Sequence, residues 1–580
     1  MSILTFIEIF LVLYITYFYF RYFTRPNPLY GPFPLPFIGT LFQIGTNPHN
    51  WIEKNIKYSK GNGIWEFYIG HLRVIAIGDA KYLDKIYLSY NESKCLSRES
   101  KFFKRSIAAS DDIGMIKGTI FNNDFHKWKR NRQFVTKVLL SKKYHLGFID
   151  SVQNLFKEFE KQWDNGVILD FPTWVSHYKT QITVETVIEK LSYSTASIYT
   201  ISKAAAEYVA MFAFLMFVPK CVSNIVLNLG FRTSKQNSIF LNGTLDHMIQ
   251  ERRDEIANGS TISEEPMDNE EIRINLAEIT STFIETTSSS LYFLIYNVAK
   301  NPSILEKIRK EITEIFSSGT NKVVTYENLD KCHYIAALIK EILRHTTPAP
   351  YNIRVLEGEE NTDKYHWSSG TWFLIDNHQI MNNSIKWNKP RKFNPDRFLS
   401  EEHGGTGEFK MRKDDFVPFG GGLRKCPGRN VILIELKLLV VLIYRKYNID
   451  ASEIQLEQSP YVTQTIELPP KETPDINENQ TTSITASKAR KGRKNRFKNP
   501  ATAAEWDSVA YESSTTWDSA TIRNSPNSSD CESVVNNNSI SSSRWNNNSA
   551  ASSEWDSLGS VPNKSYATTY RWSSNGNYNN

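Results

Sequence analysis

Apolar positions recur mainly with the 3.6-residue period of a helix from about residue 48 to residue 447. Two short stretches, beginning at Ile64 and at Arg73, alternate instead with the two-residue period of paired strands. The segment 428–445 carries apolar side chains almost all round, so we expect a helix buried in the middle of its domain. The pattern therefore predicts a mainly α body with small β-sheets.

The N-terminal apolar run predicts a membrane anchor. Residues 3–20 contain a single charge, Glu8, and eighteen residues are near the minimum that spans a bilayer. The run is long, no small-residue cleavage site follows it and no basic region precedes it, which favours an uncleaved anchor over a cleaved signal peptide. Arg21 and Arg25 flank only its C-terminal side, which places the body in the cytosol. We expect a single-pass signal anchor over 1–24, in the endoplasmic reticulum.

Composition marks two further boundaries. Residues 25–39 hold five prolines and two glycines, which exclude helix and favour a stiff extended connection, assigned here to 25–47. The main domain follows over 48–470. Residues 471–580 are rich in Ser and Asn and low in complexity, which favours disorder.

The tail contains a basic cluster and a short repeat, but its sequence does not identify a binding partner. A basic cluster at 488–498 could meet anionic lipid or nucleic acid, although most such clusters are solvated charge. Trp-Asp-Ser begins at Trp506, Trp517 and Trp555. Two origins fit this repeat: expansion of a low-complexity sequence, or selection for short linear binding motifs.

Charge and cysteine usage exclude several classes of protein. A formal charge of +6 is small for 580 residues and does not indicate a nucleic-acid binder. The cysteines lack any CxxC spacing, so neither a disulfide framework nor a zinc site is indicated, and a reducing compartment fits best. They are Cys95, Cys221, Cys332, Cys426 and Cys531.

One of these cysteines lies between a glycine cluster and the predicted central helix, in the stretch 416–429 (FVPFGGGLRKCPGR). Pro427 suits the first position of a helix, so Cys426 would lie at that helix's N-terminus. The helix dipole and its unpaired N–H groups stabilise a thiolate, which is a soft metal ligand. Glycines at 420–422 let the backbone pass close to a flat ligand. The alternative is a buried structural cysteine beside a flexible turn.

Two pairs of side chains at helical spacing occur elsewhere in the body. Trp128 and Arg132 lie four residues apart, and Glu341 and Arg344 lie three apart, so each pair shares a helix face. Such pairs are common on surfaces. A second arginine near Glu341 would distinguish that pair from an ordinary surface pair. Arg397, in a proline-stiffened loop, could be this second arginine.

Two apolar regions carry further possibilities. A long helix is expected over 271–300, and Glu285 and Thr286 interrupt its apolar pattern. These two are either a solvated stripe or an acid and a hydroxyl that face a pocket and relay protons. The region 204–229 is interpreted as a buried helix pair or as an apolar lid over an apolar site, and the two interpretations are compatible.

Together these residues resemble the cytochrome P450 family of haem-thiolate monooxygenases. The cysteine stretch matches the pattern Phe-x-x-Gly-x-Arg-x-Cys-x-Gly at every fixed position. The family's Trp-x-x-x-Arg, Glu-x-x-Arg and Pro-x-Arg-Phe patterns also occur, in the family's order. The resemblance covers roughly residues 25–460 and implies the cytochrome P450 fold, a large helical domain with small β-sheets around a buried haem.

The resemblance also implies a role for each matching residue. Cys426 would be the axial thiolate ligand of the iron of haem b. Glu341, Arg344 and Arg397 would form a buried structural triad near the proximal side of the haem. Among the positions that match the family's cofactor-binding residues, the tryptophan and the arginines would hold the haem propionates, for which a guanidinium is suited. These positions are Trp128, Arg132, Arg354, Phe419, Gly422, Arg424 and Gly428.

On the long helix, Glu285 and Thr286 match the family's acid–threonine pair and are implied to be catalytic, delivering protons to the distal oxygen. Here the chain departs from the family, because Thr282 and Phe283 replace the usual Ala or Gly and then Gly. The phenylalanine either crowds the space where oxygen binds or turns away and alters the helix bulge.

The implied activity is insertion of one oxygen atom from O2 into a lipophilic organic substrate. NADPH would act only indirectly, through a separate flavoprotein reductase, because no flavin or nicotinamide domain is apparent. Arg424, Lys425 and Arg429 could help to dock that acidic donor. The alternatives are a haem-thiolate isomerase or dehydratase that needs no external electrons, which Phe283 keeps open, and a non-catalytic haem sensor.

Overall fold

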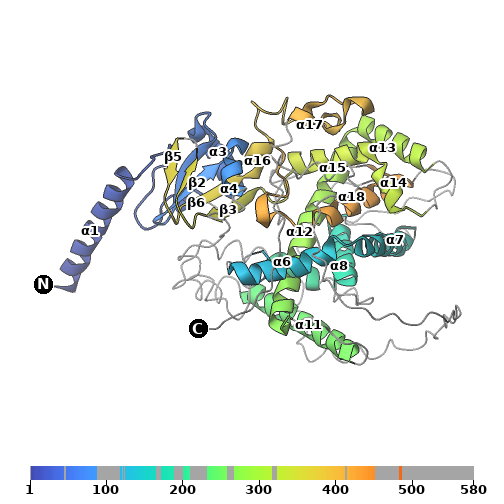
Figure 1. Ribbon diagram of the computed structural model, residues 1–580, viewed down its shortest axis with the longest axis horizontal. Coiled ribbons are helices and arrows are strands. Elements are labelled where there is room, and N and C mark those ends of the chain that lie inside the picture. Colours follow the sequence, from blue (N-terminus) through green and yellow to red (C-terminus); the bar gives the residue numbers. More distant parts are fainter. Residues whose placement is uncertain are drawn as a thin grey trace, which may run out of the picture. The chain divides into compact units, whose positions relative to one another are not determined.

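Figure 1 shows a computed structural model of the chain. The structure describes residues 2–44, 48–87, 118–120, 122, 124–164, 171–187, 200–208, 232–257, 267–316, 323–362, 364–411, 415–450 and 482–485. All of them belong to the first of two units, residues 1–488, and the second unit lies outside the described residues. The predicted tail is thus undescribed apart from 482–485, and the apolar region 204–229 is described only as far as Tyr208.

The described part of the chain is mainly helical, as the apolar period predicts. Its helices are α1 (Ile3–Phe23), α2 (Leu41–Ile44), α3 (Pro48–Asn55), α4 (Leu83–Tyr87), α6 (Phe125–Leu139), α7 (Lys142–Asp164), α8 (Phe171–Val187), α11 (Arg232–Ala257), α12 (Asn269–Lys300), α13 (Pro302–Ile315), α14 (Tyr326–Asp330), α15 (His333–His345), α16 (Asn377–Met381), α17 (Glu408–Met411) and α18 (Arg429–Tyr444).

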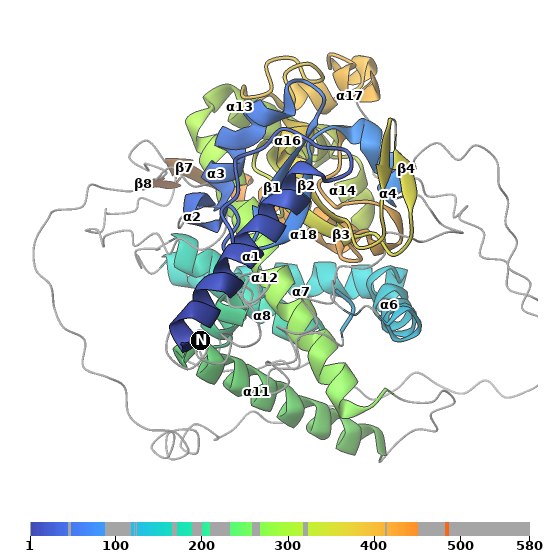
Figure 2. The same cartoon turned by 90° about the vertical axis from the view of Figure 1, so that its left-hand side faces the viewer.

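Two of these helices form the centre of the body. The N-terminus of α12 is capped by Asp268, whose carboxylate accepts from the N–H of Glu271, and Pro302 begins the next helix. Helix α12 packs against α8, α11, α15 and α18 (Figures 1 and 2). Almost every residue of α18 is buried, which confirms the central helix predicted from its all-round apolar composition.

A four-stranded sheet lies beside this helical part, in the order β1-β2-β6-β3. The strands are β1 (Ile64–Ile69), β2 (Leu72–Ile77), β3 (Tyr351–Val355), β4 (Glu360–Thr362), β5 (Tyr365–Trp367), β6 (Trp372–Asp376), β7 (Tyr447–Asp450) and β8 (Thr482–Thr485). Strands β1 and β2 pair antiparallel, as their alternation predicts, and β6 joins β2 in parallel. Trp65 and Phe67 face one apolar cluster, while Ile64 and Ile75 face another.

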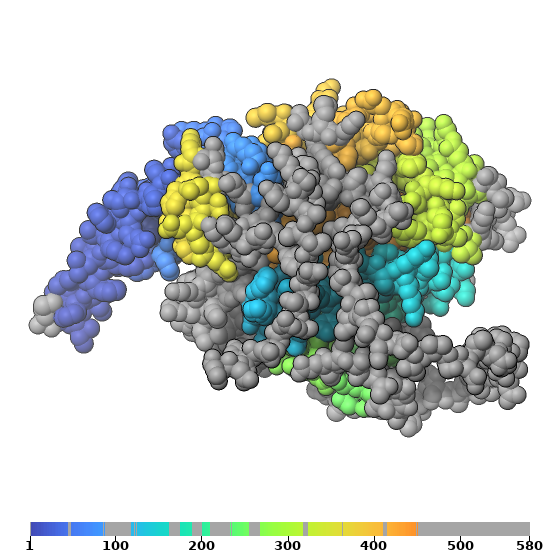
Figure 3. Space-filling model, viewed as in Figure 1, coloured from blue at the N-terminus to red at the C-terminus, as the bar shows by residue number. Residues whose placement is uncertain are grey.

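The N-terminal helix α1 is long and apolar enough to cross a membrane, and only 6% of its most apolar window is buried. It is exposed along its length at the left of Figure 3. The segment after it lies along the sheet. Glu66 of β1, whose side chain is 2% exposed, forms ion pairs with Arg25 and Arg73 at 2.6 Å. Arg73 also donates to the carbonyl oxygens of Pro26 and Asn27. The proline-rich segment is therefore held to the body by a buried carboxylate.

Candidate functional site

The cysteine loop is a tight turn that only glycines allow. Gly420 and Gly422 have φ angles of 66° and 64°, in the left-handed region that favours glycine. A Cβ on Gly422 would lie 2.1 Å from the carbonyl oxygen of Tyr87. The N–H of Cys426 donates to the carbonyl oxygen of Phe419 at 3.0 Å, which closes the loop. The two glycines and Phe419 therefore fix where the cysteine lies.

The start of the central helix corrects one prediction. Helix α18 begins at Arg429 with Gly428 as its N-cap, so the expectation that Pro427 occupies the first helical position is wrong. Pro427 and Gly428 form a turn instead, and the helix begins three residues after Cys426. This turn still aims the backbone N–H groups of Gly428 and Arg429 at the sulfur.

The groups around the Cys426 sulfur shift its pKa in opposite directions. Burial raises the pKa of the Cys426 thiol, while the N–H groups of Gly428 and Arg429 and the guanidinium of Arg132 lower it. The helix start thus acts in the direction expected from the sequence, but burial has the larger effect. A thiolate held by N–H donors in a low-dielectric setting is suited to a soft transition metal ion.

Cationic and aromatic side chains gather beside the loop. The guanidinium of Arg424 lies 4.3 Å from the centroid of the Trp128 ring, and Arg132 donates to the carbonyl oxygen of Lys425. Desolvation, followed by repulsion from Arg354, lowers the pKa of Arg424 to about 9. Helix α6 supplies Trp128 and Arg132, and β3 supplies Arg354.

This set fits an anionic group. Trp128 is 3% exposed, and its indole N–H has no hydrogen-bond partner among the residues that the structure describes. The guanidiniums of Arg354 and Arg132 both lower the pKa of Arg424, so positive charge is concentrated here. A buried donor without a hydrogen-bond partner beside clustered cations is stabilised by carboxylates. The haem propionates expected at these residues are carboxylates, so the side chains present fit the cofactor.

The predicted acid and hydroxyl lie in the middle of α12. Glu285 is half-buried, and burial raises the pKa of its carboxyl group to about 7. The hydroxyl of Thr286 donates to the carbonyl oxygen of Thr282 at 2.7 Å. That bond leaves the lone pairs of the threonine oxygen available to accept a proton donor.

Phe283 lies against helices α8 and α18. Its ring is 7% exposed, and the ammonium of Lys179 on α8 lies 4.0 Å from the ring centroid. A Cβ built on Gly428 would lie 3.7 Å from the same ring. The ring therefore packs between Lys179 and the start of α18. Helix α12 is continuous from Asn269 to Lys300.

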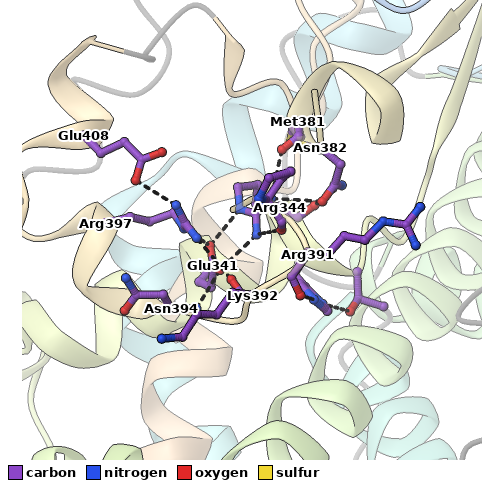
Figure 4. A network of polar contacts seen from close by, with 12 residues as sticks. Glu341, Arg344, Met381, Asn382, Arg391, Lys392, Asn394, Arg397 and Glu408 are labelled. Atoms are coloured by element: carbon purple, nitrogen blue, oxygen red, sulfur yellow. Dashed lines mark hydrogen bonds and ion pairs between the residues drawn. The ribbon is translucent and has the colours of Figure 1, made fainter. Parts of the chain in front are cut away.

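A buried ionic network lies around α15 (Figure 4). Glu341 accepts from Nε and Nη2 of Arg344 at 2.8 and 3.0 Å, and Nε of Arg397 lies 3.1 Å from the same carboxylate. Arg397 is positioned by the 3₁₀-helix η4 (Pro395–Phe398) and also donates to Glu408. The structure therefore brings the three predicted residues together, and Glu408 is a fourth member that the sequence did not predict.

The sequence patterns also missed two buried acids. Glu435 in α18 contacts Lys179, and the only hint was a single acidic residue in an otherwise apolar segment. Glu278 in α12 accepts from the backbone N–H of Ile120 at 2.6 Å. Both contacts join residues more than 150 positions apart, so no local spacing could reveal them.

Comparison with known proteins gives a family match over most of the chain. The family model described as Cytochrome P450 matches residues 29–473. "Probable cytochrome P450 516A1" from Dictyostelium discoideum is 24% identical over 438 residues, covering 70% of this chain and 85% of that protein. "Cytochrome P450 3A18" from Rattus norvegicus is 23% identical over 454 residues, covering 73% and 86%. "Cytochrome P450 4d1" from Drosophila melanogaster is 24% identical over 471 residues, covering 72% and 87%.

Proposed function

Because the chain belongs to the cytochrome P450 family and is therefore a haem-thiolate monooxygenase, we propose that it inserts one oxygen atom from O2 into a lipophilic organic substrate. The family's cofactor is haem b with a cysteine thiolate ligand. When bound, the haem supplies the activation of O2, which the electron-donating thiolate favours.

We assign the thiolate to Cys426. The observation that carries this assignment is the loop geometry, in which the N–H groups of Gly428 and Arg429 are aimed at a sulfur beside three clustered arginines. N–H donors to the sulfur tune a thiolate ligand and hold its orientation. Trp128, Arg132, Arg354 and Arg424 would hold the propionates, and the glycines and Phe419 would shape the loop beneath the cofactor.

Proton delivery is assigned to Glu285 and Thr286. With a pKa near 7, the Glu285 carboxyl group exchanges a proton readily at neutral pH. The hydroxyl of Thr286 is anchored to Thr282 and can hold a proton donor, such as a water molecule, at its oxygen. The two residues are consecutive on α12 and their side chains point about 100° apart, so a relay from the acid to the hydroxyl would run through a bridging water molecule.

Electrons are proposed to come from NADPH through a separate flavoprotein reductase. The basic docking set expected from the sequence needs correction, because Arg424 and Arg429 are 7% and 8% exposed and cannot form a docking surface. Arg424 donates inward, to the carbonyl oxygen of Asn122 at 2.5 Å. Only Lys425, which is half-buried, remains of that set.

The membrane setting is part of the proposal. Helix α1 supports a single-pass anchor, in the endoplasmic reticulum with the body in the cytosol. A membrane-held enzyme meets substrates that partition into lipid, which is why a lipophilic substrate is proposed. The proposed parts are the anchor 1–24, the connection 25–47, the haem-thiolate domain 48–470 and the tail 471–580.

Oxygen consumption tests this function. The full chain in lipid vesicles with a flavoprotein reductase should consume O2 only when NADPH and a substrate are present, and labelled O2 should leave one labelled atom in the product. Turnover of an organic hydroperoxide without NADPH would instead support an isomerase or dehydratase. Substrate binding without any turnover would support a sensor and contradict the proposed activity.

A further inference from the structure

Stacked aromatic rings join one side of the apolar helix α1 to the body. The ring centroids of Tyr14 and Phe37 lie 4.1 Å apart, and those of Tyr19 and Phe33 lie 5.5 Å apart. Such pairs stabilise a contact beyond the apolar area that they bury. Only the C-terminal half of α1 is joined in this way, and its N-terminal half extends away from the sheet (Figure 1). Helix α1 therefore docks on the body and is not a free tether.

The docking contact continues onto the sheet. Phe18 is 7% exposed and meets the ring of Tyr68 on β1 edge-on, with centroids 6.5 Å apart. Tyr22 also meets Tyr68, at 5.7 Å, and the guanidinium of Arg25 lies 4.0 Å from the Tyr22 ring centroid. Arg25 pairs in turn with Glu66, the buried carboxylate of β1. Aromatic and ionic contacts thus follow one another from the middle of α1 to the sheet.

The body surface that the upper rings of α1 touch, residues 33–42, is apolar and exposed. No charged residue occurs from 31 to 44. Clustered apolar side chains at the surface mark a contact with another apolar partner. We call residues 33–42 the apolar wedge. Its large apolar side chains are 37–53% exposed and are those of Phe33, Leu35, Phe37, Ile38, Leu41 and Phe42.

The backbone of the apolar wedge is suited to surroundings without water. The N–H groups of Leu35 and Gly39 each donate to the carbonyl oxygen of the other residue at 2.8 Å. The N–H of Thr40 donates to the carbonyl oxygen of Tyr68 at 2.7 Å. Where hydrocarbon replaces water, backbone polar groups must find their partners within the protein. These bonds meet that requirement for the turn of the wedge.

Phe37 lies within this turn in a strained conformation. Its φ angle is 67°, in the left-handed region that a bulky side chain rarely adopts. The paired N–H groups of Leu35 and Gly39 hold the turn, and the Phe37 ring stacks on Tyr14. Strain of this kind persists where the surrounding contacts over-determine it, and it points to a function for the side chain.

The stacking partner of each ring gives its depth in a bilayer. Helix α1 rises about 1.5 Å per residue, so Tyr14 lies about 10 Å further into the bilayer than Arg21, the first basic residue after the apolar run. Tyr19 lies only about 3 Å from Arg21 along the axis. Phe33 would therefore lie at the membrane boundary, where tyrosine rings gather, and Phe37 about a third of the way across a hydrocarbon core of ~30 Å.

We propose that the apolar wedge is immersed in the cytosolic leaflet beside α1, so that the anchor and the body form one unit with a fixed orientation to the membrane. The partner of this surface is the acyl chains of the bilayer. Tyr14 cannot lie inside the hydrocarbon and stack on Phe37 while Phe37 stays in water. The inference rests on the proposed function for the membrane-spanning α1, and it makes part of the expected connection 25–47 a membrane-contacting segment.

Photochemical cross-linking tests the contact with lipid. The haem-loaded full chain in phosphatidylcholine vesicles carries the photoreactive analogue p-benzoylphenylalanine in place of Phe37. Illumination should give a phospholipid adduct, detected by mass spectrometry of the digested protein. The control carries the same analogue in place of Val323, which is 58% exposed and precedes α14, on the side of the body away from α1 (Figure 1). This control should give no lipid adduct.

The same analogue on α1 tests the docking. In place of Tyr14, it should attach to the peptide that contains Phe37 in the same chain. In place of Phe10, one helical turn nearer the N-terminus and 66% exposed, it should attach to lipid alone. Attachment of the analogue at position 14 to lipid alone would show a free tether and overturn the proposal.

Protease added outside the vesicles separates failure of this inference from failure of the anchor. Protection of an epitope fused to the N-terminus shows that α1 spans the bilayer. With a protected epitope, the absence of a lipid adduct at position 37, or an adduct there to a second copy of the chain alone, would overturn the proposal. An accessible epitope would contradict the proposed anchor itself, and the immersed wedge with it.

Discussion

Glu341→Gln should cost more stability than an ordinary carboxylate substitution, because it breaks the centre of the buried network. The carboxylate accepts two bonds from Arg344 and one from the backbone N–H of Asn394 at 2.8 Å, and it pairs with Arg397. Glu341 and Arg344 are 0% exposed and the Arg397 side chain is 2% exposed. Because these side chains are buried, solvent cannot stabilise the guanidiniums that lose the carboxylate charge.

The size of the effect follows from what stays paired. Removing one partner of a buried ion pair costs about 3–5 kcal/mol. Arg397 keeps Glu408 at 2.7 Å, and Arg344 keeps the carbonyl oxygens of Met381 and Pro390. We therefore expect a loss near the lower limit, about 3 kcal/mol, from a total free energy of unfolding of about 5–15 kcal/mol.

Urea unfolding of the haem-loaded full chain in detergent measures this loss, followed by tryptophan fluorescence and by the Soret band. Glu53→Gln is the matched control, because Glu53 pairs with Arg391 at 3.0 Å while the side chains are 40% and 88% exposed. Exposed pairs contribute about 0–1 kcal/mol. If the two variants lost the same free energy of unfolding, the network would not be the buried structural centre described above.

Three further changes test other contacts. In the wild-type protein, the free energy of unfolding should fall as pH rises from 4.5 to 7, because the folded state holds the Glu285 proton over that range and the unfolded state does not. Glu285→Gln should abolish this fall. Urea titration at several pH values would contradict this if both proteins gave the same dependence on pH. Trp128→Phe should speed haem transfer to an acceptor protein about tenfold, through loss of a charge-assisted hydrogen bond, and an unchanged rate would remove Trp128 from the propionate site. Glu66→Gln should make residues 25–31 more sensitive to limited proteolysis, because Arg25 and Arg73 lose their shared carboxylate, whereas an unchanged digestion pattern would show that other contacts hold this segment.

Local patterns were sufficient to predict the elements that their own residues determine. The all-round apolar segment at 428–445 could only be a buried helix, and α18 confirms it. The alternation from Ile64 and from Arg73 predicted the β1–β2 pair. The i,i+3 spacing placed Glu341 and Arg344 on one face, and their contact follows from helix geometry alone.

Contacts between distant segments could not be predicted in this way. Lys179 and Glu435 are 256 residues apart, and nothing local to either position indicates that they pair. The proline-rich segment was expected to be only a connection, because its prolines exclude helix but say nothing of Glu66. The start of α18 differed from the prediction because Gly428, rather than the residue before Pro427, provides the N-cap.

The identity of the iron ligand is tested most directly by the absorption spectrum of the reduced chain under carbon monoxide. The wild-type protein should show the thiolate-type Soret shift, and Cys426→His, which keeps a metal ligand but not a thiolate, should bind haem and lack the shift. Cys332→Ala is the control, because Cys332 is buried in the core at 0% exposure. A shifted band that survives in Cys426→His would contradict the assignment of Cys426 as the axial ligand.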